Sequence, residues 1–230
     1  MLRSLILALT AFGATTATAE VTSARYTDPT DRYGHAVLGD AIEWGGLEVT
    51  TENGQRFKLT LPETRVFEDI EPRLIATPDG RVLVMVVETE VSTGARLSLY
   101  DESGLVAATP HIGRTNRWLA PIGAADLDGD GALEVAYVDR PHLAKTIRIW
   151  RLSDSGLAPV ADLPGFTNHR IGEDTIAGGI RECGTGPQMV VADARWRDVF
   201  AIGWDGTTFQ INPVGPHEGR SSFAKALDCR

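Results

Sequence analysis

The chain has 230 residues, 43% of them hydrophobic, and 31 acidic against 22 basic residues give a formal net charge of −9 at pH 7. This acidic balance argues against a protein that binds nucleic acid or anionic membranes through a basic surface. The 24 glycines and 12 prolines favour a fold in which many turns separate short strands.

The first residues have the pattern of an export signal. Arg3 gives a positive start, residues 5–12 form an apolar core, and residues 17–19 (Ala-Thr-Ala) are an A-x-A cleavage site. The apolar run is too short to span a bilayer, and no later stretch is long or apolar enough. We predict a signal peptide over residues 1–19, a single domain over residues 20–230, a periplasmic or secreted location and no membrane span.

Three downstream segments can be aligned with one another in sequence, at residues 73–88, 122–139 and 179–193. Each has a short lead-in, a Gly-rich turn and an apolar strand that ends in an acid, about every 50 residues. An alternating strand follows each of them, at residues 96–105, 148–157 and 199–206. An earlier copy is expected over residues 55–60, where Asn53 and Gly54 form a tight hairpin turn.

A period near 50 residues with about four strands in each period is typical of a β-propeller. Each blade is a small sheet whose faces are covered only when blades stack on one another. We therefore predict an all-β fold, a β-propeller of about four to five blades, each a small antiparallel sheet. An open sandwich is the alternative, and no amphipathic helix is expected after the signal peptide.

Residues 126–134 read Asp-Leu-Asp-Gly-Asp-Gly-Ala-Leu-Glu. Four carboxylates in nine residues repel one another unless a cation lies among them. Ca²⁺ takes several oxygen ligands, which alternate side chains and one main-chain carbonyl can supply. The predicted calcium ligands are Asp126, Asp128, Asp130, Ala132 through its carbonyl, and Glu134.

The flanks of this loop differ from those of an EF-hand, which has a helix on each side and a bidentate Glu at its twelfth position. That position is Tyr137 here, and residues 133–138 have a strand composition. The sequence therefore predicts a strand–loop–strand calcium hairpin. A plain Asp/Gly turn between two strands is the alternative.

This arrangement resembles the calcium loops of FG-GAP and VCBS-type repeats, which occur in integrin-like β-propellers and in many bacterial secreted proteins. The matching residues are Asp126, Asp128, Asp130, Gly131 and Glu134, followed by the apolar strand 135–138. The Phe-Gly and Gly-Ala-Pro motifs of the family do not occur in residues 20–230, so the resemblance is to the calcium hairpin rather than the full consensus. It implies the propeller fold and bound calcium, and it implies no substrate.

Cys183 and Cys229 are the only cysteines of the chain. In an oxidising compartment an even pair favours a disulfide, and two unpaired buried thiols are the alternative. In the chain-entropy description, closing this loop contributes roughly 4 kcal/mol to stability. The bond is expected to pin the segment around Cys229 to the last repeat.

Two connections between the predicted blades contain a similar short run of polar residues, at residues 113–118 and 166–171. In a propeller such connections ring the mouth of the axial channel, where Arg, His and Asn can bind an anionic or sugar-like ligand. Alternatively, these groups only tie blades together through hydrogen bonds to loop backbone. The candidate ligand-binding residues are Asn116, Arg117, Asn168, His169 and Arg170.

Other polar groups are expected near the same mouth. Glu68 and Asp69 hold the corresponding place before the segment at residues 73–88, and residues 139–145 form another polar cluster that includes His142. Trp118 and Trp196 lie beside these loops and are either blade-packing residues or a platform on which a sugar stacks.

No Gly-x-Ser-x-Gly, His-Glu-x-x-His, P-loop or Gly-x-Gly-x-x-Gly framework occurs, and the five histidines are scattered. We expect a monomeric, calcium-stabilised binding or scaffold module for a protein or carbohydrate ligand. The alternative is a carbohydrate-active enzyme, a lyase or a hydrolase, with its site at the axial mouth and His169 or His142 as the base. A surface adhesion protein is a third possibility.

Overall fold

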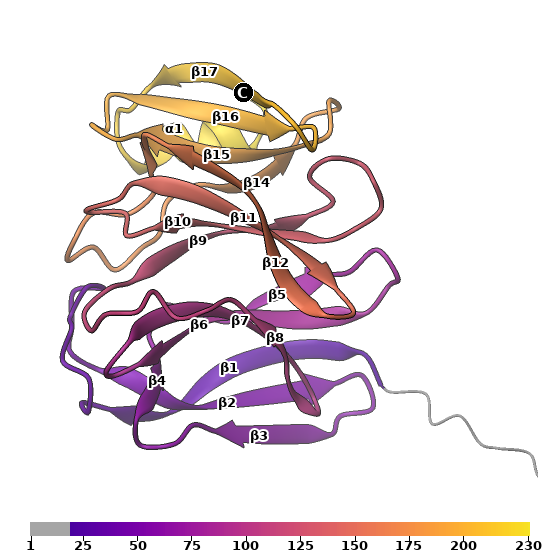
Figure 1. Ribbon diagram of the computed structural model, residues 1–230, viewed down its shortest axis with the longest axis vertical. Helices are drawn as coiled ribbons and strands as arrows, with labels where there is room; N and C mark the ends of the chain where they lie inside the picture. The colour runs from indigo at the N-terminus through magenta and orange to yellow at the C-terminus, as the bar shows by residue number, and fades with distance from the viewer. Residues whose placement is uncertain (1–18) are drawn as a thin grey trace, which may run out of the picture.

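The structure is a computed structural model, and it describes residues 19–230. Residues 1–18 of the predicted signal peptide lie outside the described residues. The described part of the chain is mostly β-strand, and Figure 1 shows small sheets stacked on one another from the N-terminal to the C-terminal end. The predicted all-β class is confirmed, and the closed ring of a propeller stays a prediction.

The first sheet holds eight antiparallel strands and has two halves. Its strands are β1 (Val21–Thr30), β2 (Glu43–Thr51), β3 (Arg56–Thr60), β4 (Arg65–Phe67), β5 (Arg73–Ala76), β6 (Val82–Glu90), β7 (Gly94–Asp101) and β8 (Gly104–Ala108). The short strand β4 pairs with β2 on one side and with β6 on the other, and so joins the halves. In Figure 1 the half with β1–β3 lies below the half with β6–β8.

Two further sheets continue the stack. The four-stranded sheet consists of β9 (Leu119–Ala125), β10 (Glu134–Asp139), β11 (Thr146–Ser153) and β12 (Gly156–Pro164). The five-stranded sheet consists of β13 (Phe166–Thr167), β14 (Gly179–Glu182), β15 (Pro187–Asp193), β16 (Asp198–Trp204) and β17 (Phe209–Pro216). Figure 1 places β1–β3 at one end of the stack and β17 at the other.

The central strands are apolar on both faces because each is covered by a layer above and a layer below. Successive side chains of a strand point to opposite faces. In β6, Val84 and Val86 pack toward β1 and β2, whereas Leu83 and Met85 pack toward the four-stranded sheet. The same alternation occurs in β10 and β15. The apolar runs seen in the sequence are therefore strands buried on both sides.

The three segments that can be laid over one another all form antiparallel hairpins. They are β5 with β6, β9 with β10, and β14 with β15. The strand that follows each segment adds to the same sheet as β7, β11 or β16. The predicted hairpin at Asn53 and Gly54 is confirmed, since β2 pairs with β3 around it and Gly54 has a φ of 78°.

The expectation of no helix after the signal peptide is wrong. A short helix, α1 (Arg220–Leu227), covers the outer face of the five-stranded sheet. Its buried residues, Phe223 and Ala226, pack against Val190 and Val199. Only two of its eight residues are buried, so its apolar periodicity is too weak to identify the helix from sequence.

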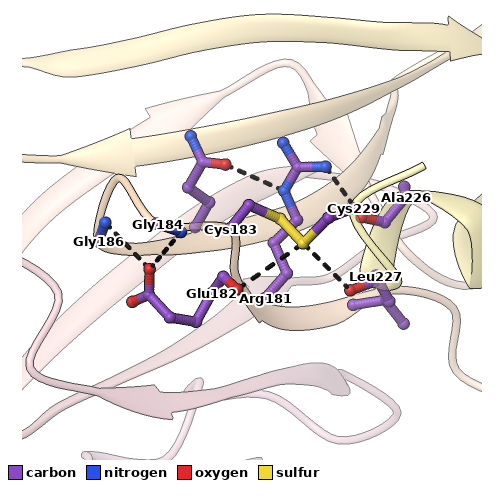
Figure 2. The surroundings of a disulfide bond; sticks show 9 residues. Arg181, Glu182, Cys183, Gly184, Gly186, Ala226, Leu227 and Cys229 are labelled. Carbon is purple, nitrogen blue, oxygen red and sulfur yellow. Dashed lines mark hydrogen bonds between the residues drawn. A yellow bond between two sulfur atoms is a disulfide. The ribbon is translucent and has the colours of Figure 1, made fainter.

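The predicted disulfide between Cys183 and Cys229 is confirmed (Figure 2), with a Cα–Cα distance of 5.8 Å. Cys183 follows β14 and Cys229 lies just beyond α1, so the bond holds the helix on the sheet. Arg181 supports the same junction by donating to the carbonyl of Ala226 at 2.8 Å.

The loop of residues 31–42, between β1 and β2, connects separate layers of the stack. The Tyr33 hydroxyl accepts a hydrogen bond from the Asn116 amide at 2.9 Å, and the carbonyl of Val37 accepts one from the Gly172 amide at 2.9 Å. Figure 1 shows the loop in indigo along one side of the stack. This 31–42 loop brings together the connections that form the candidate site.

Candidate functional site

A pocket of about 270 Å³ opens where these connections meet, and we call it the connection pocket. Four segments contribute to it: the 31–42 loop, the lead-in to β9, the loop between β10 and β11, and the connection between β13 and β14. Its lining residues are His35, Asn116, Arg117, Trp118, Arg140, Pro141, His142, Leu143 and Ile171.

On one side of the pocket, His35 is held by a buried carboxylate. Its Nδ1 lies 2.5 Å from Oε1 of Glu68, a side chain that is fully buried. The other Glu68 oxygen accepts from the Thr89 hydroxyl at 2.6 Å. Burial raises the pKa of Glu68 above its usual value, while its bonds to His35 and Thr89 oppose that shift. With Nδ1 committed to Glu68, His35 has only Nε2 left for other partners.

Behind the opposite side, two histidines form a hydrogen-bonded chain. His169 Nε2 lies 2.8 Å from the carbonyl oxygen of Glu173, which can only accept, so this nitrogen carries the proton. In neutral His169, Nδ1 is then an acceptor, and it receives the Nε2 proton of His142 at 3.0 Å. The remaining nitrogen of His142, Nδ1, therefore holds a free lone pair.

Burial keeps His142 and His169 neutral. It lowers the pKa of His142 to about 4, with the neighbouring His169 acting in the same direction. Burial also lowers the pKa of His169 below its usual value. The two rings, with centroids 5.1 Å apart, thus remain uncharged at neutral pH. His142 offers a hydrogen-bond acceptor rather than a positive charge.

The rim of the pocket combines cations with exposed apolar groups. Arg140 pairs with Asp139, Nε to Oδ1, at 2.8 Å, whereas Arg117 has no carboxylate within ion-pair distance among residues 19–230. Leu143 and Ile171 are 64% and 72% exposed, the highest values for large hydrophobic residues in the described chain. Exposed apolar side chains grouped at the edge of a pocket are a common feature of interaction surfaces.

Asn116 and Arg140 at this rim have left-handed backbones, with φ of 51° and 44°. This conformation is unfavourable for residues with a side chain, least so for Asn and Asp, and persists only where surrounding contacts hold it. For Asn116 one such contact is the hydrogen bond from its amide to Tyr33. The pocket is therefore a defined structure on the connections rather than a loose gap between them.

The five residues proposed from sequence as ligand-binding do not gather in one place. Asn116 and Arg117 line the connection pocket, and His169 lies behind it. Asn168 is fully buried and donates to the carbonyl of Pro121 at 3.0 Å, which ties two sheets together. Arg170 points elsewhere, with its guanidinium 4.5 Å from the ring centroid of Trp196.

Sequence reasoning did not assign His35, Leu143 or Ile171 to the site. His35 lies in a segment without strand or motif pattern and meets Glu68 only through a contact across 33 residues. Leu143 and Ile171 read as ordinary hydrophobic residues of loops. Their exposure, which identifies them, is a property of the folded chain.

The acidic loop lies apart from the pocket, between β9 and β10, which pair around it as predicted. Carboxylate oxygens of Asp126, Asp128 and Asp130 lie within 4.8 Å of one another. Backbone amides orient two of them: Gly131 donates to Asp126 Oδ2 at 2.9 Å and Ala132 donates to Asp130 Oδ1 at 2.8 Å. The sequence thus folds three of its acids toward a common point.

Arg151 on β11 is the positive charge nearest to this loop. It pairs with Asp128, with Asp130 at 2.9 Å, and with Oε1 of the buried Glu134 at 2.6 Å. The other Glu134 oxygen accepts from the Leu127 amide at 2.9 Å. Burial raises the pKa of Glu134, although Arg151 opposes the shift. One guanidinium offsets only one of the four acidic charges in the loop.

The acid set fits a cation. Among the described residues, Oδ1 of Asp126 is buried and has no hydrogen-bond partner. A buried carboxylate oxygen without a donor is unfavourable, and a bound cation satisfies it directly. Alternating carboxylates and backbone oxygens are the donor set that Ca²⁺ prefers.

No protein-family model, curated protein or solved structure matches this chain. In residues 19–230 no helix is long and apolar enough to cross a membrane. The class that the fold defines is an all-β chain of stacked antiparallel sheets with one disulfide. Its function has to be inferred from its own two candidate sites.

Proposed function

We propose that this chain is an exported, calcium-stabilised binding module, and that its ligand site is the connection pocket. The observation that carries the proposal is the rim, where exposed Leu143 and Ile171 lie beside Arg117, a cation without a carboxylate partner in the described chain. We further propose that the stacked sheets are blades of a propeller of the FG-GAP/VCBS type, as the calcium hairpin suggests.

The chemistry of the pocket favours a protein ligand over a carbohydrate. Sugars stack on exposed aromatic faces, and Trp118 is only 2% exposed. It donates from Nε1 to the Glu68 carbonyl at 2.8 Å, which is a packing role. The exposed aliphatic side chains suit apolar residues of a partner, and the Arg117 guanidinium suits an acidic group between them.

A second candidate, an enzyme at the same pocket, rests on His35 and Glu68. A buried carboxylate behind Nδ1 orients a histidine so that Nε2 can act as a general base. His142 and His169 are weaker candidates for this role, because their lowered pKa values make them poor proton acceptors. The buried Trp118 argues against a sugar substrate, so this candidate ranks second.

Site-specific photocrosslinking tests the binding proposal. A photoreactive amino acid at position 143 is compared with one at position 105, where Leu105 is also exposed, at 48%, but lies on β8 outside the pocket. We expect a discrete crosslinked protein from position 143 only, and its loss when Arg117→Glu is added. Equal products from both positions, or none from position 143, would refute the binding site.

Calcium would bind at the acidic loop. Asp126, Asp128, Asp130 and Glu134, with the carbonyl of Ala132, would hold the ion, which supplies the positive charge that Arg151 alone does not provide. Calcium sites of extracellular modules work at about 10⁻⁴–10⁻³ M, a range suited to an exported protein. The disulfide agrees with an oxidising compartment, the periplasm or the exterior.

A further inference from the structure

A second pocket lies at the C-terminal end of the stack, between α1 and residues 170–178, and has a volume of about 350 Å³. Ligand pockets for small molecules have about 300–1,000 Å³. The disulfide at Cys229 and the burial of Phe223 fix α1, which is one wall. The pocket, called the C-terminal pocket below, is therefore preformed.

Part of its lining is aromatic, formed by Trp196, His217 and Phe223 of α1. The ring centroids of Trp196 and His217 lie 5.1 Å apart, those of His217 and Phe223 5.6 Å, and those of Trp196 and Phe223 6.1 Å, all edge to face. Such a cluster accepts a further ring or an aliphatic chain at favourable contact distances. None of these three aromatic residues belongs to the connection pocket.

Trp196, which lines this pocket, has an unfavourable backbone conformation. Its φ is 58°, a left-handed conformation that is rare for a bulky residue. The tight turn after β15 imposes it, with the Trp196 amide bonded to the Asp193 carbonyl at 2.9 Å. Strain of this kind is concentrated at functional sites, because elsewhere a small or flexible residue serves the turn better.

Arg170 adds a free cation to this apolar pocket. Its guanidinium lies 4.5 Å from the Trp196 ring centroid, and no carboxylate of residues 19–230 is within ion-pair distance of it. Most arginines of this acidic chain pair with an acid, including Arg220 at the same pocket, which lies 3.0 Å from Asp174. Glu173 also lines the pocket without reaching Arg170.

We propose that the C-terminal pocket binds a small carboxylate with an aromatic or aliphatic body. The body would occupy the space beside Trp196 and Phe223, and the carboxylate would accept a bidentate hydrogen bond from Arg170. An anion is favoured over a neutral ligand because Arg170 presents several N–H donors to the pocket and has no protein acceptor in the described residues.

A titration with 3-phenylpropanoate, followed through the ¹⁵N-indole signal of Trp196, tests this site, with 3-phenylpropanamide as the neutral control. We expect the acid to shift that signal and to bind about tenfold more tightly than the amide, the difference that one charge-assisted hydrogen bond provides. No shift at millimolar acid, or equal affinities for acid and amide, would overturn the proposal.

Arg170→Gln is the informative variant, because Arg170 is exposed and we expect its loss to leave the fold intact. It should weaken binding of the acid about tenfold and leave binding of the amide unchanged. Arg195→Gln is the matched control, since Arg195 is exposed beside Trp196 and does not line the pocket. Equal effects of the two variants would contradict the assigned contact. The test is independent of the connection pocket.

Discussion

Removal of calcium should destabilise the protein through one buried oxygen and an excess of negative charge. Without a cation, Oδ1 of Asp126 is left buried and unpartnered, which costs about 1–3 kcal/mol. A calcium site at a free concentration 100 times its Kd stabilises the folded state by about 2.7 kcal/mol. For a domain of this size, that difference shifts Tm by about 5–10 °C.

The assay is a thermal melt in about 10 mM calcium, which is 100 times a Kd of about 10⁻⁴ M, and in excess chelator, for the wild type, Asp126→Asn and Asp154→Asn. Asp154 is the control because it is exposed on the turn after β11 of the same sheet. We expect the chelator to lower Tm by about 5–10 °C in the wild type and in Asp154→Asn. Asp126→Asn should melt lower in calcium and respond little to the chelator.

Arg151 provides the decisive comparison, because it offsets the same charges as the ion. Its removal in Arg151→Gln should lower Tm more in chelator than in calcium. If Arg151 alone neutralises the loop, Arg151→Gln lowers Tm by the same amount in both buffers. That result, together with a wild-type melt unaffected by the chelator and no calcium by elemental analysis, would refute the reasoning.

Three further predictions concern stability. The double variant Cys183→Ser/Cys229→Ser should lose roughly 4 kcal/mol of unfolding free energy in urea, and an unchanged midpoint would contradict the chain-entropy reasoning. Phe223→Ala should cost about 3–5 kcal/mol, because Phe223 is the buried anchor of α1; a loss below 1 kcal/mol would show that the helix contributes little. Burial raises the pKa of Glu43 to about 9, with nearby Glu68 acting in the same direction. Its protonated form favours the folded state, so this contribution is complete below about pH 4.5 and is lost as the pH rises toward about 9. Glu43→Gln should therefore flatten the fall of Tm between pH 5 and pH 9, and parallel curves for the two proteins would contradict this.

The sequence could predict the strands because their faces are apolar in a regular way. The runs in β6, β10 and β15 are buried on both sides, and burial of both faces leaves a continuous signal in the chain. Helix α1 has no comparable signal, since its stability comes from Phe223 packing on the sheet and from the nearby disulfide. The bond itself was predictable because only two cysteines exist.

The candidate site was predictable only in part. Asn116 and Arg117 stand in a polar connection, and the fold places them at a pocket. Asn168, His169 and Arg170 also follow one another in sequence, yet the fold buries the first, places the second behind the pocket and turns the third away to Trp196. Adjacent residues of a connection point in different directions, so similar polar runs in two connections do not imply that their side chains meet at one place.

The 31–42 loop has a consequence for how the molecule unfolds. In a simple stack each layer contacts only its neighbours, and stability is then a sum of local terms that lets the ends open independently. Here Tyr33 is bonded to Asn116, and Val37 to Gly172 at the entrance of the five-stranded sheet. Opening the first sheet therefore breaks contacts with the last one. We expect the whole chain to unfold in one cooperative transition, with hydrogen exchange of its end sheets protected to a similar extent.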